Sequence, residues 1–297
     1  MISVVIPCYN RRDGMLALLA DIYRQKGVAF EVIVVDDCSS DDSVESLRRE
    51  FPQITLLVND TNSGPCVTRN RGIRAACGTF VVGFDSDVTI PDRRLLAKVR
   101  DAFAESPGAS GFAFRILTSD GSTDDLPRWW HPVPHAQGKD RSFATDYFSG
   151  TAYAFRREVM IQAGLYPEIL YMHYEEVALA LRVLDDGGAI LYCPGLRVLH
   201  HAHQTSRRSE VQVFYKPRNQ VLLAVLCFPL WQGVAYLAPR LLCQLTKALV
   251  GGHVDEFQRA MRDAVSKISL LRSGRQPLKK GTLRRITQLR RQLVHQR

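Results

Sequence analysis

The triplet Asp85-Ser86-Asp87 places a carboxylate on either side of one residue, directly after an apolar run that ends at Phe84. Carboxylate oxygens are hard ligands, and two of them so close in sequence suit a divalent cation such as Mg²⁺ or Mn²⁺. The alternative is a solvated turn, because Asp and Ser are ordinary turn residues. The triplet alone does not decide between a metal site and a turn.

A second acidic pair, Asp36-Asp37, follows the apolar run 31–35. An acidic side chain at the end of a strand can accept hydrogen bonds from a base edge or a ribose hydroxyl. Its alternative role is to cap the next helix, but Asp41 and Asp42 are already placed for that. The first strand is followed by P-C-Y-N-R-R-D and not by the glycine-rich turn G-x-G-x-x-G, which argues against NAD or FAD.

Strands and helices alternate around these pairs. Helices of ~10–15 residues between strands indicate a parallel sheet with helical crossovers, in which ligands bind beyond the carboxyl ends of the strands. Both acidic pairs, and Tyr9-Asn10, fall at such ends. The expected strands or extended segments are 2–6, 31–35, 54–58, 79–84, 149–155, 189–193 and 196–203, and the expected helices are 12–26, about 41–50, 65–77, 157–163 and 175–186.

The 297 residues carry 39 Lys and Arg against 30 Asp and Glu, with 46% hydrophobic and 23% charged residues. This composition excludes a disordered chain, a collagen-like repeat and a small disulfide scaffold. Residues 253–297 hold 12 basic and 3 acidic residues, so the first 252 hold 27 of each and the net +9 belongs to the tail. The seven scattered cysteines argue against a disulfide framework or a zinc site. The N-terminus shows no signal sequence, so we expect a cytoplasmic protein.

Six motifs occur in an order that is typical of one enzyme family. They are V-V-I-P-C-Y-N at 4–10, V-V-D-D-C-S-S-D at 34–41, N-S-G-P-C-V-T-R-N-R-G-I at 62–73, F-D-S-D at 84–87, G-T-A-Y-A-F-R-R-E-V at 150–159 and Y-E-E-V-A-L-A-L-R at 174–182. Together they resemble the family 2 glycosyltransferases, which are inverting, nucleotide-sugar-dependent enzymes of the GT-A fold. The resemblance implies an α/β protein with a GT-A-like, mostly parallel sheet flanked by helices, followed by a C-terminal helical basic region.

The resemblance also implies which residues meet the nucleotide. Pro7 and Tyr9 match the first motif, where the family packs its backbone and an aromatic ring on the base. Asp37, with Asp36 beside it, matches the acidic residue that recognises uracil or thymine and ribose. These four residues are therefore expected in the nucleotide-sugar site.

Two further motifs extend the expected donor site. Arg69 and Asn70 match the R-N of the third motif, which lies near the nucleotide; the alternative for Arg69 is a surface salt bridge. Asp85 and Asp87 match the D-x-D element that holds the metal and the diphosphate. A metal in this position would neutralise the diphosphate leaving group as its bond to the sugar breaks. The expected cofactor is therefore a divalent cation, Mn²⁺ or Mg²⁺.

Glu175-Glu176 aligns with the family's E-D pair, whose second carboxylate is the general base. That base takes the proton of an acceptor hydroxyl while the oxygen attacks the anomeric carbon from the face opposite the leaving group. Here the second residue is Glu176 and not Asp, and the next acidic position of the usual E-D-x-D-L is Ala178. We expect Glu176 to be the base and Glu175 to face the acceptor; the alternative is that Glu176 is a surface charge.

Histidines at 200, 201 and 203 follow this helix. The family often has a histidine here that approaches the metal or the diphosphate, and His200 or His201 matches best. On an extended segment His201 points away from the other two, which argues against a three-histidine site. In the irregular stretch 119–147, Trp129 and Trp130 either stack on a sugar or lipid acceptor or anchor the loop.

The C-terminal part combines the uncharged stretch 221–238 with a basic tail. The stretch reaches the lower limit of the ~17–25 residues that a spanning helix needs, but Pro229 and Gly233 interrupt it. A buried helical hairpin, a helix in the membrane interface and a true span are all compatible with it. In 279–297, apolar residues at helical spacing oppose arginines, which is typical of a cationic amphipathic helix on anionic lipid. The alternative is a solvated tail.

The expected domains are a glycosyltransferase domain over 1–215, divided into a nucleotide-sugar half (1–105) and an acceptor half (106–215), and a membrane-association region over 216–297. The expected reaction moves a sugar from a UDP- or dTDP-sugar to a hydroxyl of a lipid-linked or cell-envelope glycan. The element Q-x-x-R-W of processive synthases does not follow the helix at 175–186, which favours transfer of one or a few sugars.

Two alternatives remain open. One is a polyprenyl-phosphate sugar synthase, whose acceptor is a phosphate and needs no strong base. The other is a catalytically inactive scaffold at the membrane. The expected partners are a nucleotide-sugar donor, a glycan or lipid-linked acceptor and an anionic membrane surface bound through 221–297 on the inner face of the cell membrane. No nucleic-acid partner is expected, because the chain shows no recognised nucleic-acid module.

Overall fold

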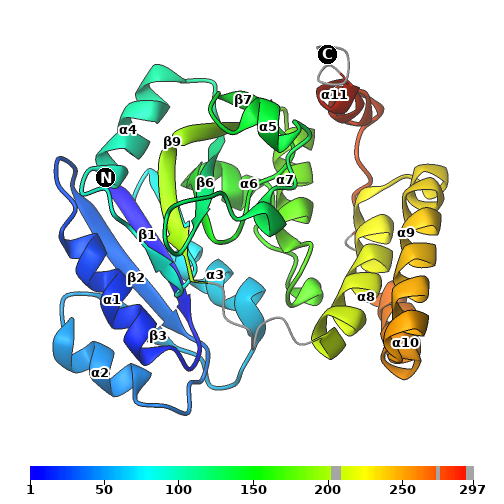
Figure 1. Cartoon of the computed structure of the whole chain (residues 1–297), viewed down its shortest axis with the longest axis horizontal. Coiled ribbons are helices and arrows are strands. Elements are labelled where there is room, and N and C mark those ends of the chain that lie inside the picture. Colours follow the sequence, from blue (N-terminus) through cyan, green and yellow to red (C-terminus); the bar gives the residue numbers. More distant parts are fainter. Residues whose placement is uncertain (202–208, 272–274, 292–297) are drawn as a thin grey trace.

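The computed structural model describes residues 1–201, 209–271 and 275–291. A nine-stranded sheet lies between two layers of helices, and a group of C-terminal helices stands beside one of these layers (Figure 1). The strands are β1 (Ile2–Cys8), β2 (Phe30–Asp36), β3 (Thr55–Val58), β4 (Phe80–Phe84), β5 (Val88–Thr89), β6 (Gly111–Thr118), β7 (Phe143–Thr145), β8 (Ala152–Arg156) and β9 (Ile190–His200).

The helices alternate with these strands in the first half of the chain and follow one another in the last third. They are α1 (Arg12–Tyr23), α2 (Ser43–Glu50), α3 (Gly64–Ala75), α4 (Leu95–Glu105), α5 (His135–Gly138), α6 (Arg157–Gln162), α7 (Glu175–Asp185), α8 (Ser209–Cys227), α9 (Leu230–Gly251), α10 (Val254–Leu271) and α11 (Lys280–Arg291), with short 3-10 turns η1 (Leu126–Arg128) and η2 (Glu168–Leu170).

The strand order is β3-β2-β1-β4-β8-β6-β9-β5, with β7 also paired to β9. The first four strands are mutually parallel, and β9 is parallel to β6. In contrast, β8 runs antiparallel to both of its neighbours, and β5 and β7 run antiparallel to β9. The sheet is therefore mostly parallel, as the sequence predicts, and the carboxyl ends of β1, β2 and β4 meet at one edge.

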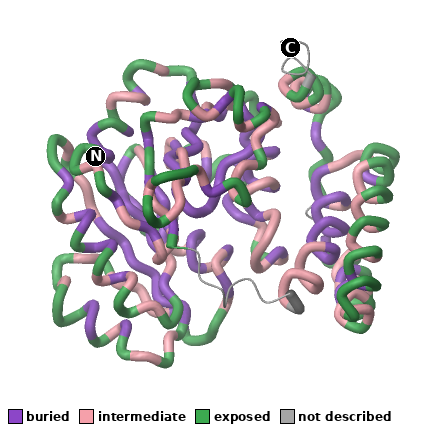
Figure 2. The backbone as a smooth tube through the Cα atoms, in the orientation of Figure 1, coloured by how far each residue is buried: buried purple, intermediate pink, exposed green. Residues whose placement is uncertain are grey.

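The apolar strand runs pack on both faces of the sheet. Along β1, Val4 and Ile6 belong to one core with α1 and α4, whereas Val5 belongs to a second core with α3, α6 and α7. Because such a strand is buried on both faces, its sequence is a continuous apolar run, without the alternation of apolar and polar residues of a half-exposed strand. Figure 2 shows the result as a buried sheet inside a largely exposed shell.

Three parts of the chain differ from the sequence expectation. Helix α4 and strand β6 lie before residue 119, in a part of the chain for which the sequence predicts no helix or strand. The irregular stretch 119–147 holds only short elements, namely η1, α5 and β7. The two expected segments at 189–193 and 196–203 form one strand, β9, whose register with β6 shifts between Phe114 and Arg115. His203 lies outside the described residues.

The uncharged stretch 221–238 is divided between α8 and α9, which pack against each other (Figure 1). The break falls at Phe228-Pro229, because Pro229 has no N–H to continue the first helix. In α8, Leu222 and Leu223 are buried against the second core, whereas Trp231 at the start of α9 is 78% exposed. Across the described ranges, every helix is too short or too polar to cross a membrane. Helix α8 runs across the expected boundary at 215/216.

The basic tail forms helix α11 as far as Arg291, and residues 292–297 lie outside the described ranges. Its apolar residues Leu283 and Ile286 pack against the second core, so part of the predicted amphipathic face contacts the protein itself. Arg290 donates from Nε to Asp146 Oδ2 at 2.7 Å. The tail is thus docked on the body of the molecule.

Candidate active site

Arg69 on α3 joins the acidic residues of two distant segments. Its Nη2 lies 2.6 Å from Asp85 Oδ1, at the end of β4, and its Nη1 lies 3.4 Å from Glu175 Oε1, at the start of α7. Burial opposes the charged guanidinium, but Asp85 and the groups around it raise the pKa of Arg69, so the cation persists. Arg69 therefore bridges two segments, with an ion pair to Asp85 and a hydrogen bond to Glu175.

Glu175 and Glu176 occupy the first turn of α7, where the positive end of the helix dipole stabilises negative charge. Glu175 is buried, and its Oε2 makes no hydrogen bond among the described residues. Burial, with the charge of Glu176, raises the pKa of Glu175 to about 8. Glu175 therefore holds a proton at neutral pH, and the adjacent Glu176 is the carboxylate suited to accept one.

Gly150 brings the backbone close to Glu176. The Gly150 N–H donates to Glu176 Oε1 at 3.1 Å. A Cβ at Gly150 would lie 2.4 Å from that oxygen and 2.9 Å from Arg69 Nη2, so no side chain fits here. The contact places the Glu176 carboxylate beside the Asp85–Arg69–Glu175 bridge. The third acidic position of the family pattern, Ala178, is buried in the second core.

The segment Leu170–Tyr174, just before α7, has an unusual backbone. Tyr171, His173 and Tyr174 all have positive φ, a region that costs a non-glycine residue roughly 1–2 kcal/mol. A buried amide on α8 holds this segment: Asn219 Nδ2 lies 2.6–2.8 Å from the carbonyl oxygens of Leu170, Met172 and His173. The strained segment thus aims Glu175 and Glu176 at the site.

The neighbours of Asn219 on α8 extend this support. Arg218 Nη2 donates to Ile169 O at 2.9 Å, and Gln220 Nε2 donates to the Tyr174 hydroxyl at 2.6 Å. All three side chains are buried. Sequence reasoning missed this run, because its partners are backbone carbonyls far away in the chain. The signal was three consecutive polar residues directly before the apolar stretch 221–238.

Asp87 faces a buried histidine. His200 Nδ1 lies 2.6 Å from Asp125 Oδ2, and His200 Nε2 lies 3.7 Å from Asp87 Oδ2. Burial disfavours the charged ring, but the interaction with Asp87 raises the pKa of His200. Asp87 Oδ1 is buried and has no hydrogen-bond partner among the described residues. Asp125 is a residue that the sequence did not single out.

These groups fit a divalent cation in part. In residues 1–201, 209–271 and 275–291, no three His, Cys, Asp or Glu side chains form a ready metal cluster. Mg²⁺ and Mn²⁺ sites, however, often use one or two protein carboxylates together with substrate phosphates. Asp87 offers an oxygen without a partner, and Asp125 orients the His200 ring as a carboxylate orients a metal-ligating histidine. Asp87 and His200 are thus the groups that would hold the ion.

His201 lies on the other side of β9, as expected for an extended segment. Its Nε2 is 2.8 Å from Thr89 Oγ1, its side chain is exposed, and its backbone N–H donates to Asp87 O. Of the two histidines considered, the structure brings His200 to Asp87. A metal contact by His201 stays a prediction.

The carboxylates expected at the nucleoside are both buried and hydrogen-bonded within the protein. Asp36 accepts bonds from Ser39, and Asp37 accepts bonds from Asn59 Nδ2, Ser63 N and Gly64 N at 2.7–2.9 Å. A carboxylate has about four acceptor positions, so Asp37 keeps capacity for one more donor. These bonds fix the loop before α3 at the sheet edge.

The aromatic ring expected at the base lies near this loop. Tyr9, two residues after Pro7 in chain order, is 48% exposed at the end of β1. Pro7 itself is inside β1, paired with Val35. Tyr9 therefore offers an open ring face at the same edge as Asp37, and the base contact stays a prediction.

Asn70 is buried and its amide is used inside the protein. Its Oδ1 accepts from Tyr166 N at 2.9 Å, and its Nδ2 donates to Tyr166 O at 2.8 Å and to Glu168 Oε1 at 3.0 Å. These contacts tie α3 to η2, next to the strained segment. Nucleotide contact by Asn70 stays a prediction.

The two tryptophans have different surroundings. Trp129 packs against His131, His135, Phe143 and Tyr192, and its Nε1 donates to Val133 O at 2.7 Å. Trp130 is 43% exposed and stacks on Tyr147 at 5.7 Å between ring centroids. Trp129 thus anchors the loop, which was one of the two sequence interpretations, whereas Trp130 keeps a free face.

Arg128, at the end of η1, is a further residue that sequence reasoning missed. Burial opposes its charge, but Asp85, Tyr147 and Glu176 raise the pKa of Arg128. A cation so close to both carboxylates suits a diphosphate leaving group. Its position in the irregular stretch 119–147 gave no periodic signal from which to predict it.

A family model for glycosyl transferase family 2 matches residues 3–164. The chain belongs to glycosyl transferase family 2. This match covers more than half of the chain and confirms the resemblance that its motifs predict.

An uncharacterized glycosyltransferase of Haemophilus influenzae is 39% identical over 87 residues, which are 29% of either chain. The succinoglycan biosynthesis protein ExoO of Rhizobium meliloti is 32% identical over 121 residues, 40% of this chain and 35% of the relative. The chain thus matches about a third of the length of these curated relatives.

Solved structures confirm the GT-A fold. The mannosyltransferase PcManGT of Pyrobaculum calidifontis, in complex with GDP-Man and Mn²⁺, aligns with a TM-score of 0.60 at 19% identity over 97% of this chain and 83% of that one. Residues 1–349 of S. aureus TarS, in complex with UDP, align with a TM-score of 0.58 at 21% identity over 82% of this chain and 72% of that one. At this identity the likeness concerns the fold.

Proposed function

We propose that this family 2 member is an inverting, non-processive glycosyltransferase that moves a sugar from a UDP- or dTDP-sugar to a hydroxyl of a lipid-linked or cell-envelope glycan. The observation that carries the proposal is the bridge Asp85–Arg69–Glu175, in which the Arg69 guanidinium joins the D-x-D element to the start of α7. The names of relatives such as ExoO, a succinoglycan biosynthesis protein, support an envelope glycan as the acceptor.

In the proposed reaction, Glu176 takes the proton of the acceptor hydroxyl. The acceptor oxygen then bonds to the anomeric carbon, and the bond from that carbon to the diphosphate oxygen breaks with its electron pair on the diphosphate. Glu175 keeps its proton at neutral pH, so repulsion between two adjacent carboxylates is avoided. Gly150 N–H fixes one oxygen of Glu176 and leaves the other for the acceptor.

The donor side is proposed to use three kinds of group. Asp87 and His200 would hold a divalent cation, and such an ion would supply positive charge to the leaving diphosphate. Arg128 adds a second positive charge at that place. Tyr9 covers the base, and Asp37 accepts a hydrogen bond from the nucleoside. Solved relatives of this fold with UDP, GDP-Man and Mn²⁺ support a nucleotide sugar and a cation as ligands.

The test compares three substitutions in purified full-length protein. Glu176→Gln and Asp87→Asn are each expected to lower kcat by ~10²-fold or more, because a positioned base alone contributes ~10²–10⁴-fold. Glu158→Gln is the matched control, since Glu158 is the second residue of α6 as Glu176 is of α7, but its side chain is exposed. Folded Glu176→Gln and Asp87→Asn variants that transfer sugar at the wild-type rate would show that the proposed function is wrong.

We also propose peripheral binding to the inner face of an anionic membrane through 221–297. On α9, Trp231, Leu242 and Leu249 are exposed and spaced by 11 and 7 residues, which places them on one helix face. Basic residues on α11 add attraction to anionic lipid. A Leu242→Ser/Leu249→Ser variant is expected to pellet less with anionic vesicles, while Leu126→Ser, exposed on η1, is the control. Equal pelleting of the variant and the wild type would contradict this proposal.

A further inference from the structure

A pocket of about 360 Å³ opens beside the proposed base, between the irregular stretch 119–147 and helices α8 and α9. It has an aromatic wall from Trp130 and Tyr174 and a polar wall from the two helices. The residues that line it are Trp130, Tyr174, Gln212, Val213, Lys216, Gln244 and Lys247.

The pocket borders the segment that leads into the proposed base. Tyr174 directly precedes Glu175 and Glu176 at the start of α7. Trp130 stacks on Tyr147, whose pKa is raised by burial and by the charge of Glu176. Tyr174 therefore joins the wall of the pocket to the first turn of α7, which carries Glu176.

The charges in the pocket are of one sign. Two lysines, Lys216 and Lys247, line it, and none of the described lining residues is acidic. Lys216 Nζ instead donates to Gln212 Oε1 at 2.6 Å. Burial and the charge of Lys247 both lower the pKa of Lys216, so the two cations repel each other when the pocket is empty. An anion between them would remove this repulsion.

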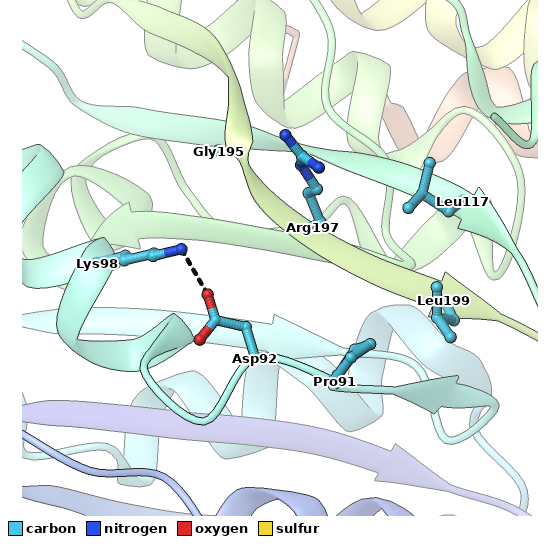
Figure 3. Close-up of a pocket in the computed structure, with 7 residues that line it drawn as sticks. All are labelled: Pro91, Asp92, Lys98, Leu117, Gly195, Arg197 and Leu199. Carbon is cyan, nitrogen blue, oxygen red and sulfur yellow. Dashed lines mark ion pairs between the residues drawn. The ribbon is translucent and has the colours of Figure 1, made fainter. Parts of the chain in front are cut away.

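A second hollow differs from this pocket in how its lysine is paired. It has a volume of about 350 Å³, lies along β6, β9 and α4, and is lined by residues that include Lys98 and Asp92 (Figure 3). There the lysine is neutralised, since Lys98 Nζ lies 2.5 Å from Asp92 Oδ2. The other cation of that hollow, Arg197, donates from Nε to Pro194 O at 2.9 Å. The lysine of that hollow is thus paired with a carboxylate, whereas Lys216 donates to an uncharged amide.

The chemistry of the lining favours a phosphate. Lysine ammonium groups are compact point charges, and two of them match a phosphate that carries up to two negative charges. A carboxylate carries a single charge and is better matched by the planar fork of an arginine. The exposed face of Trp130 is suited to stack on a sugar or polyol ring or chain. The pocket thus combines an anion site with a carbohydrate platform.

We propose that this pocket binds a phosphate group of the acceptor, with Lys216 and Lys247 contacting the phosphate oxygens and Trp130 packing on the adjoining sugar or polyol. The inference rests on the proposed function, because it names the acceptor class of that same site. The phosphate is an anchor, and a separate hydroxyl near Glu176 is the nucleophile. The phosphate belongs either to a lipid carrier or to a polyol-phosphate chain.

The test titrates the full-length protein with two probes, a prenyl phosphate in detergent micelles and a soluble glycerol-phosphate oligomer. Prenol and glycerol are the uncharged controls. Calorimetry gives the dissociation constants, first with UDP and Mn²⁺ at saturation so that the donor site is filled, and again without them. Wild-type protein is expected to bind at least one phosphate probe and neither uncharged control.

The Lys216→Gln/Lys247→Gln variant is expected to bind that probe at least tenfold more weakly, since a hydrogen bond from a charged group contributes about one power of ten or more. Lys98→Gln, in the second hollow, is the matched control and should bind as wild type does. The probe that binds identifies the source of the phosphate. Failure of both probes to bind, or equal binding by the double variant, would overturn the proposal.

Donor binding separates this outcome from the proposed function. The Lys216→Gln/Lys247→Gln variant is expected to bind UDP with Mn²⁺ at the wild-type affinity, because neither lysine contacts the donor groups. Loss of phosphate binding with intact UDP binding assigns the pocket to the acceptor. If the wild type binds phosphate probes but no nucleotide sugar, the proposed function fails and the phosphate site stands. If it binds nucleotide sugar but no phosphate, only the pocket proposal fails.

Discussion

Replacing Asn219 by alanine tests how α8 positions the proposed base. The Nδ2 group lies near three carbonyl oxygens of the Leu170–Tyr174 segment, and its two hydrogens can satisfy two of them at a time. Two such bonds contribute about 1 kcal/mol each, and each buried carbonyl left without a partner costs about 1–3 kcal/mol. We therefore expect Asn219→Ala to lower the free energy of unfolding by about 2–5 kcal/mol.

The same change should affect catalysis, because the segment that Asn219 holds carries three residues with positive φ. Relaxation of this backbone would move Glu176, and a shift of about 1 Å can lower a rate ~10²-fold. Asn219 is a positioning residue, so we expect a fall in kcat with an unchanged KM for the nucleotide sugar. Urea unfolding and steady-state transfer assays measure the two effects.

A buried amide elsewhere supplies the control. Gln25 joins α1 to α4, with Nε2 donating to Asp92 O at 2.8 Å and Oε1 accepting from Leu96 N at 3.1 Å. Gln25→Ala should lose a similar amount of stability and keep the wild-type kcat. If Asn219→Ala loses stability but also keeps the wild-type kcat, the positioning role of Asn219 is refuted.

Three further predictions concern other parts of the site. Gly64 has φ +84° and its added Cβ would lie 2.4 Å from the Tyr171 ring, whereas Gly187 has φ +87° and open space. Gly64→Ala should therefore destabilise the protein more than Gly187→Ala in urea unfolding, and equal losses would contradict the clash. Glu175 keeps its proton up to about pH 8 in the folded protein but only to its ordinary pKa near 4.5 when unfolded. As the pH rises between these values, the free energy of unfolding should therefore fall by at most about 1.4 kcal/mol per pH unit, and Glu175→Gln should remove that slope. Parallel pH curves of the variant and the wild type would contradict the raised pKa of Glu175. Asp125→Asn should weaken Mn²⁺ binding in the presence of UDP by ~10–100-fold by calorimetry, and an unchanged affinity would remove Asp125 from the metal site.

Much of the donor half could be predicted from sequence. Tyr9, Asp37 and Asp85 each follow an apolar strand run, and the carboxyl ends of parallel strands meet at one edge of the sheet. The local sequence pattern was therefore enough to predict that these residues lie at the same edge of the sheet. The same holds for Glu175-Glu176, which a recognisable motif places at the start of a helix.

The part of the site that comes from residues 106–215 depended on contacts that leave no local pattern. Arg128 and Asp125 come from an irregular stretch, and their partners Glu176 and His200 lie about 50–75 residues away. Trp129 and Trp130 are neighbours in sequence, yet one is packed among aromatic rings and the other faces a pocket. Backbone direction in a loop without regular structure decides such differences.

The sequence by itself determined the alternating strands and helices of residues 2–84, the family, and the acidic residues that follow those strands, because periodicity and motif are local properties of the chain. Only the tertiary structure decided that 221–238 is divided between two helices, that Asn219 holds the strained segment before the base, and that two lysines of α8 and α9 meet Trp130 in one pocket. The physical reason is that buried hydrogen bonds and pockets join residues far apart in sequence, and their partners are fixed only when the core packs.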